Sequence, residues 1–88
     1  MAPPRVTVYT TSYCPYCVRA KALLSRKGVA FEEISVEGND RLRTWLVEQS
    51  GQLTVPQVFA GERPLGGFSD LDALDRAGQL DPILRGEP

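Results

Sequence analysis

The order of apolar and polar residues along the chain predicts alternating strands and helices. Apolar and polar side chains alternate over residues 5–10, as expected for a strand. From Pro15, apolar residues recur every three or four positions until Gly28, which predicts a helix. Residues 29–36 then predict a second strand. A strand, helix and strand of these lengths form a right-handed crossover that leaves the two strands parallel.

The middle of the chain predicts a second helix followed by a hairpin. Asn39 is a suitable N-cap for this helix, which ends near Gly51 and carries Leu42, Trp45 and Leu46 on its buried face. Residues 57–60 and 63–66 are short strands, and the close turn between them indicates an antiparallel hairpin. Pro64 has no N–H to donate, so we expect the last strand to lie at a sheet edge.

A third helix is predicted after the hairpin. Ser69 and Asp72, three residues apart, fit a capping box that opens this helix. Leu71 and Leu74 would face inward, and Gly78 would end the helix. The predicted class is α/β in the order β-α-β-α-β-β-α, a four-stranded mixed sheet flanked by helices in a single domain, residues 1–88.

The chain contains only two cysteines, Cys14 and Cys17, and no histidine. Structural zinc usually takes four Cys or His ligands, so one copy of the chain cannot close such a site. Pro15 suits the first turn of a helix and places Cys14 at the N-cap. Unpaired N–H groups and the helix dipole there favour a thiolate, the attacking form of a thiol. We therefore predict Cys14 as the nucleophile and Cys17 as the resolving thiol.

Composition narrows the class of protein. Ten basic and eleven acidic residues nearly cancel, which argues against a nucleic-acid binder. Residues 18–28 nevertheless carry four basic and no acidic side chains, which favours an anionic partner beside the reactive thiol. No run of about eighteen apolar residues or signal-peptide core is present, so we expect no membrane span and a cytoplasmic location. In that reducing compartment the cysteine pair is expected to be catalytic.

Three segments together resemble the glutaredoxins, small oxidoreductases of the thioredoxin fold. They are Cys14-Pro15-Tyr16-Cys17, then Thr54-Val55-Pro56, then Gly66-Gly67-Phe68-Ser69-Asp70, and their order and spacing extend the resemblance over nearly the whole chain. The first segment resembles the dithiol class. The resemblance implies a thioredoxin-like fold and glutathione-dependent reduction of protein disulfides and of glutathione mixed disulfides. It also implies a monomer without a metal or tightly bound cofactor, with glutathione as reductant and co-substrate and disulfide-containing or glutathionylated proteins as clients.

The resemblance assigns the Thr54-Val55-Pro56 segment to glutathione binding. It implies a cis peptide bond before Pro56. Val55 would then offer its backbone N–H and C=O beside Cys14, as a template for an extended peptide such as glutathione.

The resemblance also assigns the two ends of the tripeptide. Gly67 would allow close approach, and the start of the third helix would bind the γ-glutamyl carboxylate, with Ser69 donating to it. Asp70 would take the α-amino group, and Arg43 would meet the glycine carboxylate. Tyr16 would flank the tripeptide.

The chain departs from the family at two positions. Thr11 stands where many glutaredoxins have a lysine near the active thiol, and Leu53 stands where some have a basic residue. Loss of these cations would lower the reaction rate and the affinity for glutathione rather than change the reaction.

Two other functions fit the same residues. Some glutaredoxins bridge two chains through a [2Fe–2S] cluster held by the first cysteine of each chain and two glutathiones, although Pro15 favours a rigid turn and the dithiol enzyme. The other is a glutaredoxin-like redoxin that is recharged by thioredoxin reductase. Residues 67–70 favour glutathione over this reductase as the source of electrons.

Overall fold

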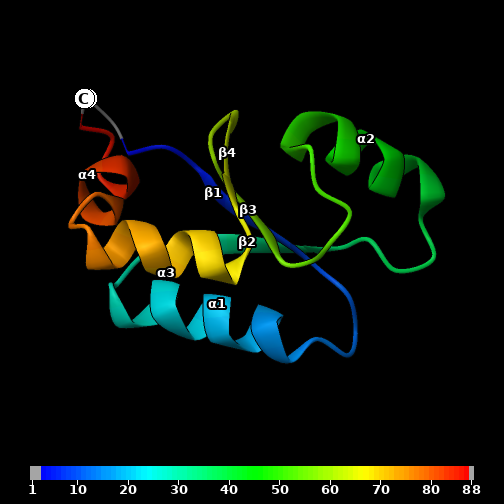
Figure 1. Ribbon diagram of the computed structural model, residues 1–88, viewed down its shortest axis with the longest axis horizontal. Helices are drawn as coiled ribbons and strands as arrows, with labels where there is room; N and C mark the ends of the chain where they lie inside the picture. The colour runs from blue at the N-terminus through cyan, green and yellow to red at the C-terminus, as the bar shows by residue number, and fades with distance from the viewer. Residues whose placement is uncertain (1–2, 88) are drawn as a thin grey trace.

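A four-stranded mixed sheet in the order β2-β1-β3-β4 forms the middle of the molecule (Figure 1). The computed structural model describes residues 3–87, so residues 1–2 and 88 of the predicted domain lie outside it. The strands are β1 (Val6–Thr10), β2 (Phe31–Ser35), β3 (Gln57–Ala60) and β4 (Arg63–Gly66). The helices are α1 (Pro15–Arg26), α2 (Asp40–Ser50), α3 (Phe68–Arg76) and α4 (Leu80–Leu84). The pairing confirms parallel β1 and β2, an antiparallel β3–β4 hairpin, and β4 at the sheet edge.

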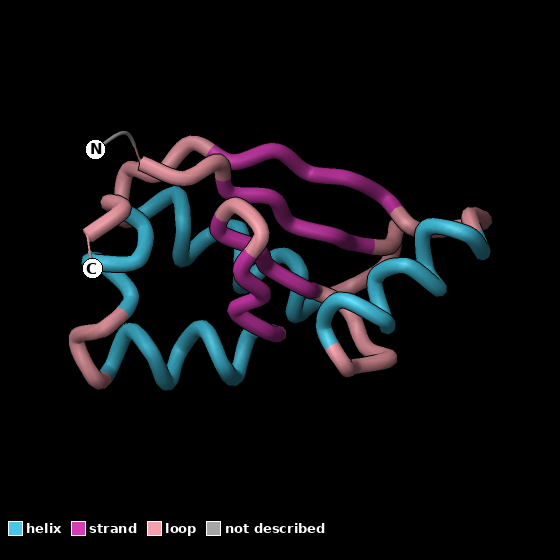
Figure 2. Tube along the Cα trace, turned by 90° about the horizontal axis from the view of Figure 1, so that it is seen from above, coloured by secondary structure: helices cyan, strands magenta, loops and turns pink. Residues whose placement is uncertain are grey.

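The two faces of the sheet bury separate sets of apolar side chains. Because side chains alternate along a strand, Val6 and Val8 of β1 face one way and Tyr9 faces the other. The first set packs with residues of α1, α3 and α4, and the second packs with Leu46 of α2 and Phe59 of β3. α2 and α4 also lie at opposite ends of the molecule (Figures 1 and 2).

The start of α3 differs from the prediction. The N-cap is Gly67, and the carboxylate of Asp70 accepts a hydrogen bond from the Gly67 N–H over 3.0 Å. The predicted capping box of Ser69 and Asp72 is therefore wrong by two residues, because Gly67 already has the extended backbone of an N-cap. Ser69 lies inside the first turn of α3 and is not the N-cap.

The exposed position of Trp45 also corrects the prediction for α2. Leu46 is buried and Leu42 is partly buried, but Trp45 keeps 40% of its surface exposed. Its ring lies against Phe59 and Tyr9, with centroids 5.9 and 5.6 Å apart. The indole thus covers the solvent-facing rim of this cluster while Leu46 packs inside it.

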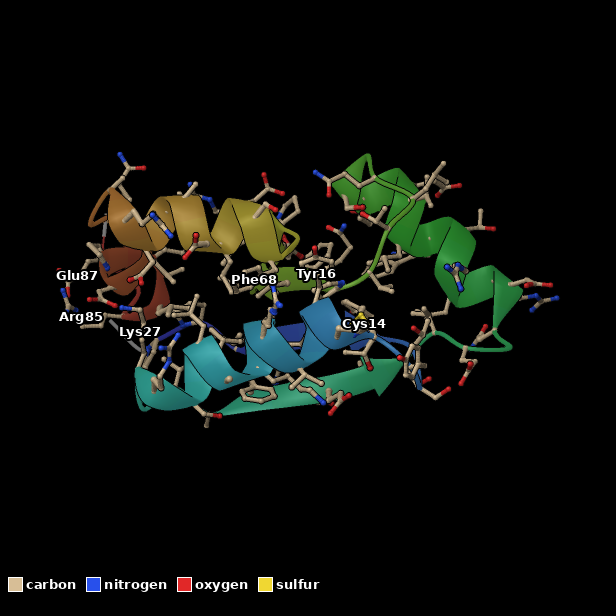
Figure 3. All side chains as sticks on the ribbon, turned by 60° about the horizontal axis from the view of Figure 1, so that its bottom comes forward. Cys14, Tyr16, Lys27, Phe68, Arg85 and Glu87 are labelled. Atoms are coloured by element: carbon tan, nitrogen blue, oxygen red, sulfur yellow. A yellow bond between two sulfur atoms is a disulfide. The ribbon has the colours of Figure 1, made fainter. Side chains whose placement is uncertain are left out.

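The sequence did not predict α4. Leu80 and Leu84 are buried against the α1 and α3 side of the sheet. Lys27, after the end of α1, forms ion pairs with Asp75 at 2.5 Å and with Asp81 at 2.8 Å. Hydrogen bonds from Lys27 lower the pKa of Asp81, and those to Asp75 and Asp81 raise the pKa of Lys27. This lysine joins three helices at the end of the molecule far from the cysteines (Figure 3).

Candidate active site

Cys14 and Cys17 form a disulfide at the first turn of α1. Cys14 is the N-cap, with extended backbone, and its Sγ accepts a hydrogen bond from the Cys17 N–H over 3.1 Å. Pro15 occupies the first helical position, where no intrahelical acceptor exists for an N–H. Cys14 is partly exposed, whereas Cys17 is only 2% exposed. An incoming disulfide can therefore reach the sulfur of Cys14 and not that of Cys17.

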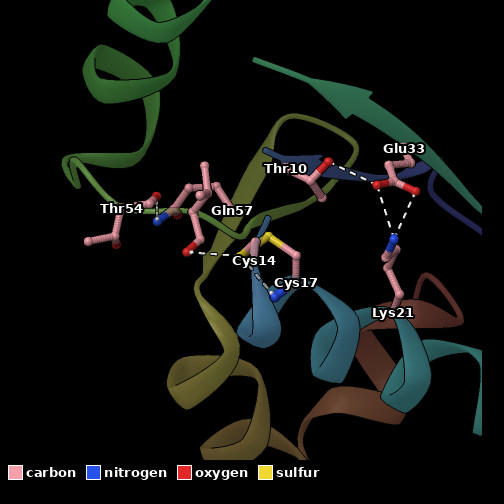
Figure 4. Close-up of a disulfide and its surroundings, with 8 residues drawn as sticks. Thr10, Cys14, Cys17, Lys21, Glu33, Thr54 and Gln57 are labelled. Carbon is pink, nitrogen blue, oxygen red and sulfur yellow. Dashed lines mark hydrogen bonds and ion pairs between the residues drawn. A yellow bond between two sulfur atoms is a disulfide. The ribbon is translucent and has the colours of Figure 1, made fainter. Parts of the chain in front are cut away.

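The Thr54-Val55-Pro56 segment lies directly beside this disulfide. The predicted cis peptide bond between Val55 and Pro56 is confirmed. The carbonyl oxygen of Val55 lies 3.8 Å from the Sγ of Cys14. Segments 41 residues apart in the chain thus meet at the reactive sulfur (Figure 4).

A cavity of about 310 Å³ opens beside the Thr54-Val55-Pro56 segment; neither cysteine lines it, and Val55 connects it to the sulfur of Cys14. Its lining includes seven of the eight residues to which the sequence assigned glutathione binding, namely Tyr16, Thr54, Val55, Pro56, Gly67, Ser69 and Asp70. The eighth, Arg43, is exposed on α2 and does not line it.

Two further lining residues, Gln52 and Phe68, were missed by the sequence reasoning. Phe68 lies between Gly67 and Ser69 in the glycine-rich segment, so its position in that segment could have indicated that it lines the site. Gln52 lies in the loop before the Thr54-Val55-Pro56 segment, and only the folded chain reveals that this loop reaches Asp70.

The aromatic wall of the cavity comes from α1 and α3. The rings of Tyr16 and Phe68 lie with their centroids 6.3 Å apart, and Figure 3 shows them facing each other between the two helices. The guanidinium of Arg19 lies over the Tyr16 ring, 5.2 Å from its centre. A cation over an aromatic face attracts the ring electrostatically and holds it in place.

A second group of polar side chains lies on the other side of the disulfide (Figure 4). Glu33 of β2 accepts hydrogen bonds from Lys21 over 3.1 Å and from the buried hydroxyl of Thr10 over 2.9 Å. These bonds, first that of Lys21 and then that of Thr10, lower the pKa of Glu33. All three residues line a cavity of about 250 Å³ together with both cysteines. Lys21 follows Cys17 by four residues, and this spacing could have indicated that both side chains lie on one face of α1.

Residues 3–87 contain neither a cluster of metal-ligand side chains nor a helix that could span a membrane. No group of three or more His, Cys, Asp or Glu side chains is arranged to hold a metal ion within this part of the chain. Among the same residues no helix has the length and apolar character needed to cross a membrane.

An N-cap cysteine paired with a buried one, on a four-stranded mixed sheet flanked by helices, defines a thiol–disulfide oxidoreductase of the thioredoxin-like fold. Within that class the chain belongs to the glutaredoxin family, whose model matches residues 6–65. It is 54% identical to a glutaredoxin from Pseudomonas aeruginosa over 81 residues, 92% of this chain and 96% of the relative.

Solved structures agree with this assignment. The solution structure of a glutaredoxin from Brucella melitensis matches 100% of this chain and 97% of its own, with a TM-score of 0.87 and 45% identity. The crystal structure of a buckwheat glutaredoxin–glutathione complex matches 92% of this chain and 76% of its own, with a TM-score of 0.86 and 32% identity.

Proposed function

We propose that this glutaredoxin uses glutathione to reduce glutathione mixed disulfides and protein disulfides. The observation that carries the proposal is the cavity of about 310 Å³ beside Cys14, which joins an aromatic wall, a peptide-like backbone edge and a carboxylate. Its volume is at the lower end of the range of small-molecule sites. The similar buckwheat glutaredoxin was crystallised as a complex with glutathione.

Each part of the cavity suits one part of the tripeptide. The N–H groups of Phe68 and Ser69 open α3 without intrahelical acceptors, so they suit the γ-glutamyl carboxylate, and the Ser69 hydroxyl adds a donor. Asp70 suits the α-amino group. The backbone of Val55 suits the cysteinyl residue, because its carbonyl already lies beside Cys14. Thr54 and Tyr16 border the glycine half, and Arg43 on α2 is left to meet its carboxylate outside the cavity.

The reaction on a glutathionylated protein exchanges one disulfide for another at Cys14. The Cys14 thiolate attacks the glutathione sulfur, and the client sulfur leaves as a thiolate that takes up a proton. A second glutathione thiolate then attacks the mixed disulfide on Cys14, which releases oxidised glutathione and regenerates the Cys14 thiolate. The net reaction oxidises one glutathione thiol: the client sulfur becomes a thiol, and the incoming glutathione joins the glutathione taken from the client as oxidised glutathione.

Reduction of a protein disulfide uses both cysteines. Cys14 attacks one client sulfur, and Cys17 then attacks Cys14, which releases the client dithiol and forms the Cys14–Cys17 disulfide. The buried position of Cys17, one turn from Cys14, suits this second step because its only accessible partner is Cys14. Two glutathione molecules return the pair to dithiols.

We also propose that the protein acts as a monomer and in the cytoplasm. A monomer suffices, because one chain supplies both cysteines and the cavity. A reducing compartment, and so the cytoplasm, suits an enzyme that draws electrons from glutathione.

The decisive experiment follows NADPH consumption by glutathione reductase while the enzyme reduces a glutathionylated peptide. We expect Cys14→Ser to be inactive and Cys17→Ser to retain activity, because glutathione can replace Cys17 on this substrate. An inactive wild type would reject glutathione as reductant. Activity restored by thioredoxin reductase would then indicate a redoxin, and brown colour with dimerisation on anaerobic reconstitution would indicate a [2Fe–2S] protein.

A further inference from the structure

Gln57 is a buried amide in a position where a strand normally carries an apolar residue. It follows Pro56 at the start of β3, is 0% exposed, and by alternation faces the same side of the sheet as Phe59. Its Nε2 donates to the backbone oxygen of Thr54 over 2.9 Å and to the Oε1 of Gln52 over 2.8 Å. Its own Oε1 has no hydrogen-bond partner within residues 3–87. A half-satisfied buried amide costs stability, so its presence calls for a role beyond packing.

The chemistry of these contacts fixes the direction of both glutamine amides. A backbone carbonyl can only accept, so Gln57 must turn its NH₂ group toward Thr54. The same NH₂ group meets Gln52, whose amide must therefore present its oxygen. The NH₂ group of Gln52 is left pointing away from the core. It lies 3.5 Å from the Oδ2 of Asp70, the longest link of the series.

The carboxylate of Asp70 is held at one oxygen. Its Oδ2 accepts from the Gly67 N–H over 3.0 Å as well as from Gln52, and among the described contacts none uses Oδ1. The Asp70 side chain also lies close to the backbone of Gly66: a Cβ on Gly66, whose φ is +97°, would lie 2.7 Å from the Cγ of Asp70. Asp70 is thus held through Oδ2 and packed against Gly66 in the lining of the cavity.

Gln52 stands at the boundary between two cavities. The cavity of about 310 Å³ beside Cys14 and a neighbouring one of about 510 Å³ both have Gln52 and Asp70 in their linings. The contact between Gln52 and Asp70 therefore lies on the wall that the two cavities share.

We propose that Gln57 and Gln52 are positioning residues that aim the Asp70 carboxylate at the α-amino group of the γ-glutamyl end of glutathione. This rests on the function proposed above and adds its specificity: the glutamine relay selects mixed disulfides whose small thiol carries an α-amino acid end. The amide of Gln57 is hydrogen-bonded both to the backbone of Thr54 and to Gln52. One buried side chain therefore links the segment beside Cys14 to the carboxylate that recognises the amino group.

The test compares two substrates that differ only at the γ-glutamyl end. A fluorescent peptide is joined by a disulfide to glutathione or to cysteinylglycine, and each is mixed with pre-reduced enzyme without free glutathione. Release of the peptide in a single turnover gives one rate constant for each substrate. We expect wild type to prefer the glutathione disulfide. We expect Gln52→Leu and Gln57→Leu to lower this preference roughly three- to tenfold through the glutathione substrate alone, which is the fold-change that the net contribution of one ordinary hydrogen bond gives.

Gln49→Leu is the matched control, because Gln49 is an exposed residue of α2 and lines neither cavity. Its preference should equal that of wild type. Asp70→Asn should lose the preference, and adding Gln52→Leu to it should change nothing more, because the relay acts only through the carboxylate. Gln52 is exposed, so Gln52→Leu will fold even if Gln57→Leu does not.

The outcomes separate this proposal from the one on which it rests. A wild type without preference for the glutathione substrate would overturn the proposed function itself. A wild type with that preference, together with an unchanged preference in Gln52→Leu, would overturn the relay alone. Equal slowing of both substrates would also overturn it, because it would show a merely structural role.

Discussion

The backbone N–H of Cys17 donates to the Sγ of Cys14 over 3.1 Å. The donor belongs to the main chain, and its position depends on Cys14 being the N-cap and Pro15 the first residue of α1. The stabilisation of a negative sulfur at Cys14 therefore does not require the Cys17 side chain.

A first prediction concerns this donor. In Cys17→Ser, Cys14 should react with iodoacetamide several-fold faster than the cysteine of an unstructured peptide at about pH 6, because more of it is thiolate. Alkylation followed by mass spectrometry measures both rates. The advantage should vanish in denaturant, and a folded variant that reacts like the peptide would contradict the prediction.

A second prediction concerns the Tyr16 ring. Tyr16→Ala should raise KM for the glutathionylated peptide roughly three- to tenfold, because the ring packed on Phe68 forms a wall of the cavity. Tyr16→Phe keeps the ring and should behave as wild type. Steady-state kinetics with the coupled glutathione reductase assay decide. Equal loss in both variants would show that the hydroxyl, and not the ring, matters.

A third prediction tests whether α4 belongs to the core. Leu80 is 0% exposed, so Leu80→Ala should lower the free energy of unfolding by about 2–5 kcal/mol. Gln79→Ala, one residue earlier and exposed, should change it by less than about 0.5 kcal/mol. Urea denaturation of the oxidised protein gives both values. A small effect of Leu80→Ala would mean that α4 is only loosely attached.

A fourth prediction concerns the pH dependence of the ion pairs of Lys27. The pKa of Lys27 is raised above its ordinary 10.5, so its contribution to stability is complete below that pH and is lost as the pH rises through the folded value. The pKa of Asp81 is lowered below its ordinary 3.8, so its contribution is present above that pH and is lost as the pH falls through the folded value.

Lys27→Met should therefore lower Tm by a few degrees near neutral pH and by less at both extremes. Thermal unfolding followed by circular dichroism across this pH range measures the difference from wild type. Arg26→Met provides a control, since Arg26 is an exposed neighbour at the end of α1. If the difference in Tm were the same at every pH, the effect would come from packing of the Lys27 methylene groups and not from the ion pairs.

Most of the fold could be predicted because its signals are local. Alternation marked β1, three- and four-residue spacing marked α1, and the turn at residues 61–62 marked the hairpin. α4 escaped because its five residues include a proline and carry too few turns for a periodic pattern, and its place depends on contacts with α1 and α3. The exposure of Trp45 depends likewise on how α2 meets the sheet.

The candidate site divides in the same way. The chemistry of Cys14 and Cys17 is indicated by their spacing and by the proline between them, and seven of the nine residues that line the cavity of about 310 Å³ were recognised through motifs of the family. Gln52 and Gln57 could not be found, because neither a buried amide nor a loop glutamine has a distinctive spacing. Their meaning arises only from distances that the folded chain sets.

The placement of Pro64 on β4 affects how the margin of the sheet meets other polypeptide chains. Free sheet edges recruit extended chains and seed aggregation, and natural proteins guard them with proline and charge. Here one outer strand carries Arg63 and Pro64 and the other carries Glu32 and Glu33. An extended chain therefore meets charged residues at both margins of the sheet and a proline at one of them, which disfavours its pairing there and protects the protein against edge-to-edge aggregation.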